Sequence, residues 1–192
     1  MTLFSTFCWI WWAIAQSEAV PTTSTALTQG AQALENPSVR YVSNYVSIPY
    51  PMGDVPADTG VCTDVVIRAY RAVGIDLQQL LHEDIIANPN RYPNIKRPDS
   101  NIDHRRVPNL GTFFKHQGTA LAITNNANDD QPGDVVWWKL GSPTGLNHIG
   151  IVIDQTSADG TPLVIHNIGN GQVVENILFN HHVVGHYRYF GS

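Results

Sequence analysis

Cys62 is the residue of this sequence best suited to nucleophilic chemistry. It opens the stretch CTDVVIRAYRAVG, in which apolar residues recur at helical spacing up to Gly74, a glycine typical of a helix end. Cys62 is thus predicted to lie in the first helical turn, where free N–H groups and the helix dipole favour thiolate over thiol. The alternative is a small buried apolar residue, but such a residue has no need of that position. We expect a reactive thiol.

Two histidines in the C-terminal half supply a base and a group to orient it. His148 begins HIGIVID, and His166 lies near the end of PLVIHNIG. With QPGDVVWWKL at 131–140, these stretches predict three strands of an antiparallel meander. Alternation places His148 and Gly150 on one face, where the glycine leaves room for another element. Neighbouring strands can bring the two imidazoles together, and thiol, base and orienting group are the parts of a cysteine hydrolase.

A zinc site built from His148, His166 and a third ligand is the competing interpretation. The sequence contains neither HExxH nor a paired CxxC, so we expect no metal and no other cofactor. The remaining histidines near the C-terminus, His181, His182 and His186, are expected to cap or border the last strand.

Composition indicates one globular domain and excludes some classes of partner. The chain has 192 residues, of which 43% are hydrophobic and 14% charged, enough to bury one core. The net charge is −5 and no run of lysine or arginine occurs. A nucleic-acid groove is therefore not expected, and neither is a membrane-surface helix or stable membrane insertion. We expect a monomer.

The first fifteen residues predict export to the periplasm or beyond. They carry no charge, are too short an apolar run to span a bilayer, and end in Ala13-Ile14-Ala15, which a signal peptidase could cut. The usual basic residue ahead of the run is missing, so a buried N-terminal helix or a wrong start codon is the alternative. If the segment is removed, Cys8 leaves with it and Cys62 is the only thiol. An unpaired cysteine in an oxidising compartment implies a use.

The rest of the chain is predicted to form a linker and a catalytic domain. Residues 16–40 read as a Ser/Thr linker that continues as a short helix at Ala26 to Glu35, and residues 41–192 as the catalytic domain. Inside that domain, 82–111 is rich in Asn, Pro and charge, which predicts a long inserted loop with short helical pieces.

The helix-borne cysteine, PGDVVWW, HIGIVID and VIHN together resemble the NlpC-type cell-wall cysteine peptidases of the papain-like superfamily. More closely, the chain from about Tyr41 to Phe190 resembles a bacterial family known only as a domain of unknown function. That likeness rests on YPMGDVPADTGVCTDVVIRAYRAVGIDL, NIDHRRVPNL, HIGIVID, VIHNIGNG and GHYRY. The resemblance implies an α+β fold in which a cysteine-bearing helix packs on an antiparallel half-barrel sheet.

For chemistry, the resemblance implies amide hydrolysis in peptidoglycan. It assigns Cys62 as nucleophile, His148 as general base and His166 as the orienting third residue. Tyr50 stands twelve residues before Cys62, where some members place a tyrosine of the oxyanion hole. Many such peptidases read DCS at the nucleophile, whereas this chain reads GVCTD, and we group Asp64 with Tyr50 as an auxiliary residue.

The charge-dense part of the inserted segment predicts recognition of an acidic peptide. Two arginines in a loop suit carboxylates, which guanidinium binds in two-pronged fashion. We therefore expect the segment to border the Cys62 cleft, with Val107-Pro108 discouraging a helix from running on. An equal alternative is that one arginine pairs with Asp103 or Asp64 and only holds the loop. The expected substrate-binding residues are Asp103, His104, Arg105, Arg106, Asn147 and Asn167.

The function predicted from sequence is a cysteine amidohydrolase or peptidase that acts on peptidoglycan or its peptide fragments. It would cleave an amide bond of the stem peptide or the link between sugar and peptide, through a thiol acyl-enzyme. One alternative is a cell-wall binding module without catalysis, which would have no reason to keep Cys62, His148 and His166 together. Another is an acyltransferase that uses the same thiol. The sequence cannot distinguish an acyltransferase from a hydrolase, because the two differ only in which acceptor reaches the acyl-enzyme.

Overall fold

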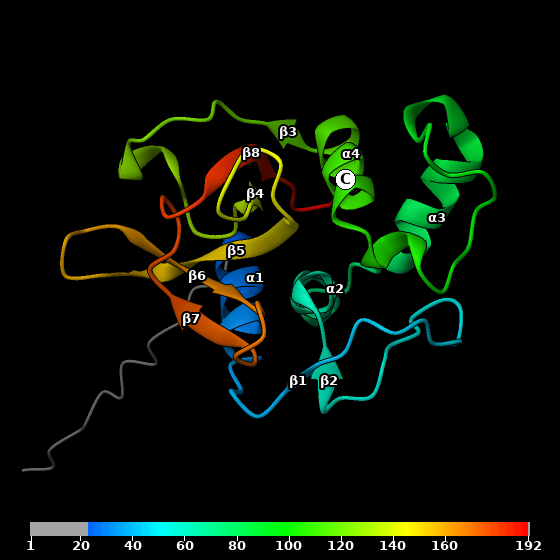
Figure 1. Cartoon of the computed structure of the whole chain (residues 1–192), viewed down its shortest axis with the longest axis horizontal. Coiled ribbons are helices and arrows are strands. Elements are labelled where there is room, and N and C mark those ends of the chain that lie inside the picture. The colour runs from blue at the N-terminus through cyan, green and yellow to red at the C-terminus, as the bar shows by residue number, and fades with distance from the viewer. Residues whose placement is uncertain (1–22, 192) are drawn as a thin grey trace, which may run out of the picture.

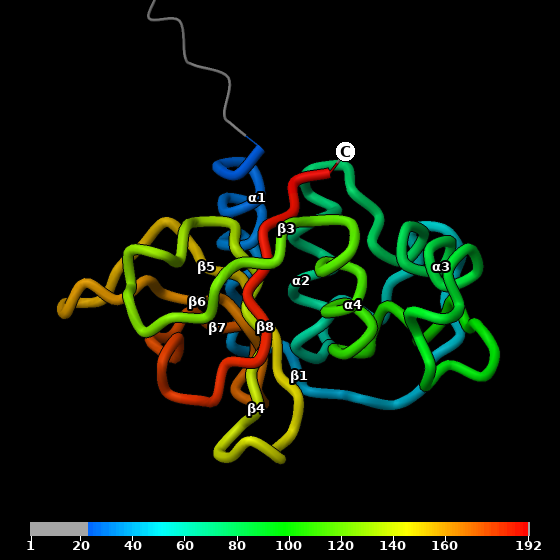
Figure 2. Tube along the Cα trace, turned by 90° about the horizontal axis from the view of Figure 1, so that it is seen from above, coloured from blue at the N-terminus to red at the C-terminus, as the bar shows by residue number. Residues whose placement is uncertain are grey.

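A six-stranded antiparallel sheet with helices on one face forms the framework (Figures 1 and 2). The structure, a computed structural model, describes residues 23–191; the predicted signal peptide and the start of the linker lie outside them. The helices are α1 (Thr23–Gln32), α2 (Cys62–Ala72), α3 (Leu77–Ala87) and α4 (Val107–Gln117), with 3-10 turns at Pro89–Arg91, Asp103–Arg105 and Ala127–Asp129. The strands are β1 (Arg40–Tyr41), β2 (Thr59–Gly60), β3 (Thr119–Ala120), β4 (Val135–Lys139), β5 (Asn147–Thr156), β6 (Pro162–His166), β7 (Val173–Glu175) and β8 (His182–Arg188).

The sheet has the strand order β3-β8-β4-β5-β6-β7, and every neighbouring pair is antiparallel. The meander predicted from 131–166 is therefore confirmed as β4, β5 and β6. The strands β1 and β2 form a separate parallel pair directly before α2. The predicted α+β class, with the cysteine-bearing helix packed against an antiparallel sheet, is confirmed.

Helix α2 is buried between the sheet and the other helices. Its apolar residues join one core with α1, α4 and the inward side chains of β5, among them Val65, Ala69 and Ile151. Helix α1 packs closely on α2 because Gly30 has no side chain; a Cβ there would lie 2.6 Å from the Cβ of Ala72. As predicted, the helix begins at Cys62 and ends before Gly74, which adopts φ +79°.

The opposite face of the sheet carries a second apolar cluster. It contains Val136, Trp138, Val152 and Val164 from the strands. Ile177 and Leu178, in the connection from β7 to β8, cover this cluster. The two faces of β5 thus serve different cores, because successive side chains of a strand point to opposite sides.

The inserted segment is more helical than the sequence predicts. Helix α3 continues to Ala87 and α4 begins at Val107, so the irregular part is 88–106. The expectation that Val107-Pro108 discourages a helix is wrong, because α4 begins at Val107 and Pro108 lies in its first turn. Proline suits that turn because the N–H it lacks would have no helical partner there. The short helix expected at 26–35 is α1, three residues earlier. No helix within 23–191 is both long and apolar enough to cross a membrane.

A buried ion pair joins this segment to the cysteine helix. Arg105 donates from Nε to Asp64 Oδ1 at 2.8 Å and from Nη2 to Asp64 Oδ2 at 3.0 Å. Both side chains are almost completely buried. Asp64 also accepts the Val61 N–H at 2.7 Å and so caps the first turn of α2. One carboxylate therefore fixes both the helix start and the loop opposite it.

Loss of this pair should destabilise the protein. Arg105→Ala leaves Asp64 buried without its cation, which typically costs about 3–5 kcal/mol of unfolding free energy. Arg106→Ala removes the same side chain one residue further on, from an exposed position, and should change stability by less than about 0.5 kcal/mol. Urea unfolding of both variants measures the difference; equal, small losses would contradict a structural role for the pair.

Candidate active site

Cys62 lies at the first position of α2 with its sulfur surrounded by backbone donors. The N–H groups of Ile149, Thr63 and Cys62 itself are directed at the sulfur and favour the thiolate. Burial has the opposite and larger effect, because Cys62 is only 4% exposed. It raises the pKa of the Cys62 thiol to about 11. The prediction of a resting thiolate is therefore wrong, because loss of water outweighs the helix N-terminus.

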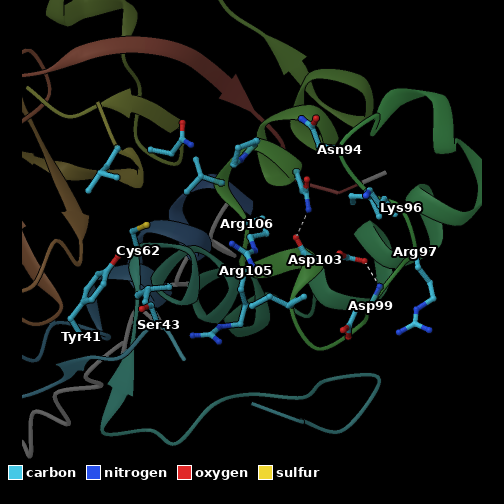
Figure 3. Close-up of a pocket in the computed structure, with 18 residues that line it drawn as sticks. Tyr41, Ser43, Cys62, Asn94, Lys96, Arg97, Asp99, Asp103, Arg105 and Arg106 are labelled. Atoms are coloured by element: carbon cyan, nitrogen blue, oxygen red, sulfur yellow. Dashed lines mark hydrogen bonds between the residues drawn. The ribbon is translucent and has the colours of Figure 1, made fainter. Parts of the chain in front are cut away.

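Cys62 lines a pocket with a volume of about 860 Å³. The start of α2 and the segment 41–43 form one wall, and 94–109 forms the other (Figure 3). The pocket is also lined by Leu146 and Asn147, at the entry to β5. The expectation that the inserted segment borders the cysteine cleft is borne out by this lining.

The far wall of the pocket is mainly basic, although Asp99 and Asp103 also line it. Lys96, Arg97 and Arg106 all line it, and all three are exposed. In Figure 3, Arg106 lies between Cys62 and the pair Lys96 and Arg97. The side chain of Arg106 has no hydrogen bond or ion pair to any residue of 23–191, so its guanidinium is available to a ligand.

The other residues expected to bind substrate in DHRR are held inside the protein. Arg105 lines the pocket but is bound to Asp64, as the structural alternative predicted. Asp103 is buried, which raises the pKa of its carboxyl, and it accepts the Asp99 N–H at 2.6 Å to shape the loop. His104 does not line the pocket; burial lowers its pKa to about 4 and keeps it neutral. Of the four, Asp103, Arg105 and Arg106 line the pocket, and only Arg106 is exposed.

The two expected histidines form a hydrogen-bonded chain that extends to a third residue. His148 Nε2 and His166 Nδ1 are 3.0 Å apart, and His166 Nε2 is 3.0 Å from Glu175 Oε2. Burial, and then repulsion from His166 and His181, lowers the pKa of His148 to about 3. Sequence reasoning missed Glu175, because nothing in VVEN predicts which strand β7 joins.

Cys62 and the imidazole of His148 lie on opposite faces of β5. The Ile149 side chain lies in the core with Cys62, whereas the His148 ring packs near Trp138 in the second cluster, with ring centroids 5.8 Å apart. No hydrogen bond joins Cys62 to a histidine among the described residues. The backbone N–H directed at the sulfur nevertheless belongs to Ile149, the residue next to His148. The room beside Gly150 is taken by β6, since a Cβ there would lie 2.7 Å from Val164.

Tyr41, and not Tyr50, is the tyrosine beside the thiol. The pairing of β1 with β2 sets Tyr41 opposite Gly60, two residues before Cys62. Figure 3 shows the Tyr41 ring directed toward Cys62, and burial is the main cause that raises the pKa of the Tyr41 hydroxyl. Tyr50 instead packs on His82 and does not line the pocket. The sequence hides Tyr41 because two-residue strands leave no periodic signal.

The two expected asparagines have different fates. Asn147 lines the pocket, and its Oδ1 accepts from Trp137 Nε1 at 3.0 Å, which leaves its NH₂ group toward other partners. Asn167 is fully buried and donates to Gly60 O at 3.4 Å. The expectation that Asn167 binds substrate is wrong: it ties the end of β6 to the chain before Cys62. Asp64 likewise acts as a cap and ion-pair partner.

No group of three or more His, Cys, Asp or Glu side chains within 23–191 is arranged to hold a metal ion. The pocket offers a thiol, a tyrosine hydroxyl and a basic wall, and the neutral imidazole chain lies across β5 without lining the pocket. These are groups for nucleophilic attack and proton transfer.

Comparison with known proteins identifies relatives without a described activity. The curated protein named "Uncharacterized protein YijF" from Escherichia coli K12 is 52% identical over 171 residues, which cover 88% of this chain and 82% of that protein. A crystal structure from Staphylococcus aureus, titled as similar to a lipoprotein of the NLP/P60 family, aligns with 93% of this chain at 13% identity and a TM-score of 0.44. This chain spans 45% of that one, and at this TM-score the likeness decides nothing about fold or function.

A family model described as a domain of unknown function, DUF1287, matches residues 28–189. The match covers most of the chain, including the cysteine helix, the inserted segment and the whole antiparallel sheet. The relation to a family of unknown function expected from the sequence is thus confirmed, and the chain belongs to the DUF1287 family.

Proposed function

We propose that this protein is a cysteine amidohydrolase that cleaves an amide bond in the peptide part of peptidoglycan, after export from the cytoplasm. One observation carries the proposal. Cys62 stands at a helix N-terminus on the wall of a pocket of about 860 Å³ whose opposite wall is basic. A cysteine kept only for packing needs neither a pocket nor a tyrosine hydroxyl beside it.

In this proposal the Cys62 sulfur attacks the amide carbonyl carbon while His148 takes the thiol proton. Burial raises the pKa of the thiol and lowers that of His148, so the proton moves as the S–C bond forms and not beforehand. The resting thiol and imidazole are not hydrogen-bonded, and such contacts often tighten only when substrate is bound. The imidazolium then protonates the leaving amine, and water releases the acyl group from the sulfur.

The oxyanion that forms during attack needs two donors. The Cys62 backbone N–H lies at the start of α2, where no helical acceptor uses it; it is directed at the sulfur in the resting site and would be taken over by the oxyanion during attack. The Tyr41 hydroxyl, beside the thiol, supplies the second donor in place of the expected Tyr50. Preformed donors of this kind stabilise the developing charge without reorganisation.

The basic wall suits a substrate with free carboxylates. Arg106, Lys96 and Arg97 lie away from Cys62 along the pocket, so they would hold a part of the substrate distant from the bond that is cut. Peptidoglycan stem peptides carry several carboxylates and fit this arrangement. Arg106 is the residue assigned to bind them, because it alone of the two arginines in DHRR is free.

The first test is digestion of purified peptidoglycan, with the products read by mass spectrometry. Wild type should release new peptide or sugar fragments, and Cys62→Ala should release none. Cys62→Ser keeps the size of the side chain, so it should remain folded and lose at least about 10³-fold of the activity. Fragment masses identify the bond, and a product joined to an added amine would indicate acyl transfer. Equal release by wild type and Cys62→Ala would contradict the assignment of the nucleophile.

The second test concerns Arg106. Arg106→Ala should weaken kcat/KM for acidic stem peptides by roughly 1.5–3 kcal/mol, the value of one charged hydrogen bond, and should affect amidated peptides less. Lys115→Ala removes one exposed positive charge from α4, outside the pocket, and serves as the matched control. If both variants lose the same activity on both substrates, the effect comes from overall charge and Arg106 has no specific role.

A further inference from the structure

The hydrogen bond between His148 and His166 has no direction of its own. Each neutral imidazole has one N–H and one bare nitrogen, so either ring can donate to the other. If His166 donated from Nδ1, then His148 Nε2 would be bare and its Nδ1 would carry the proton. If His148 donated from Nε2, its Nδ1 would be bare instead. These two arrangements differ in whether the outer nitrogen of His148 can accept a proton.

Glu175 provides the asymmetry. Its carboxylate can only accept, so the His166 nitrogen 3.0 Å away, Nε2, must carry the proton. Burial lowers the pKa of His166, although the charge of Glu175 acts in the opposite direction. The His166 ring is therefore neutral, and its Nδ1 carries no proton. His148 Nε2 must then donate to His166 Nδ1 across 3.0 Å. The free nitrogen of His148 is Nδ1, in the form that can take up a proton.

The surroundings support this assignment. Among residues 23–191, His148 Nδ1 has no hydrogen-bond partner, yet it is not among the buried nitrogens sealed from solvent. The Nδ1 of the neighbouring His181 is both sealed and unpartnered. His148 is only 2% exposed, but its Nδ1 is neither sealed nor occupied by another residue of 23–191, so this nitrogen is free to accept a proton.

Strand register explains why Glu175 can reach His166. In the β6–β7 pair, Val164 lies opposite Glu175 and His166 opposite Val173. His166 and Glu175 are thus diagonal neighbours on one face, a spacing that long side chains bridge. Figure 1 shows β5, β6 and β7 side by side. The Glu175 side chain is 40% exposed, so its removal should leave the core intact.

We propose that Glu175 is a positioning residue that fixes the tautomers of His166 and His148, so that His148 Nδ1 is the nitrogen that accepts the proton. Its catalytic consequence rests on the function proposed above. There, the Cys62 S–H bond breaks as the S–C bond forms, and the proton moves to His148 Nδ1. The resulting imidazolium keeps its Nε2–H bond to His166, and later the Nδ1 proton goes to the leaving amine.

Nitrogen-15 NMR of histidine-labelled protein at neutral pH tests the tautomers without any substrate. Wild type should show His148 and His166 both protonated at Nε2 and bare at Nδ1, with signals assigned from His148→Gln and His166→Gln. Glu175→Ala should shift both rings toward a mixture of tautomers. Glu175→Gln, which keeps an acceptor oxygen, should retain more of the original pattern. Glu83→Ala removes an exposed glutamate from α3 and should change nothing.

A His148 ring protonated at Nδ1 in wild type, or an unchanged pattern in Glu175→Ala, would overturn the proposal. The NMR result does not depend on whether peptidoglycan is the substrate. A failed digestion would contradict the proposed function alone, and an unexpected tautomer pattern would contradict the role of Glu175 alone. With an active enzyme, Glu175→Ala should lower kcat by about tenfold or more and leave KM nearly unchanged, because loss of the correct tautomer affects proton transfer and not binding.

Discussion

The buried pair of Asp64 and Arg105 is the interaction on which the arrangement of the site depends. Asp64 caps the turn that carries Cys62, and the same carboxylate binds the arginine of the inserted segment. The two walls of the pocket are therefore joined by one charged group. Such a pair adds little net stability compared with apolar packing. An arrangement that separated the two charges would, however, leave one of them buried without a partner, at a large cost in free energy. We infer that its role is to set the position of the pocket wall relative to the thiol.

Strand β5 connects the two halves of the proposed chemistry. Its backbone N–H at Ile149 meets the sulfur, while the adjacent His148 begins the imidazole chain to Glu175. Burial keeps both the thiol and His148 neutral at rest. This differs from a site in which a preformed thiolate waits beside an imidazolium, and it places the proton transfer within the attack on the substrate.

The sequence predicts the elements well where periodicity and glycine are informative. The cysteine helix, its end at Gly74 and the strands that carry His148 and His166 are found as predicted. The contacts that depend on register were not predictable: Tyr41 reaches Cys62 through a two-residue strand, and Glu175 reaches His166 through β7. The burial of individual polar side chains could not be predicted from the sequence either. Arg105, His104 and Asn167 are polar residues that sequence reasoning assigned to substrate, whereas the fold uses them inside the protein.

We infer that Cys62 is a pocket-facing thiol that burial keeps neutral until a substrate arrives. The rate of alkylation of Cys62 by iodoacetamide, measured from pH 6 to 12 by peptide mapping that reads Cys62 apart from Cys8, tests it directly. We predict a slow reaction at neutral pH that rises with an apparent pKa of about 11, and little change in that value for His148→Ala. An apparent pKa below the ordinary thiol value of about 8.5, raised by His148→Ala, would contradict the account and establish a resting ion pair.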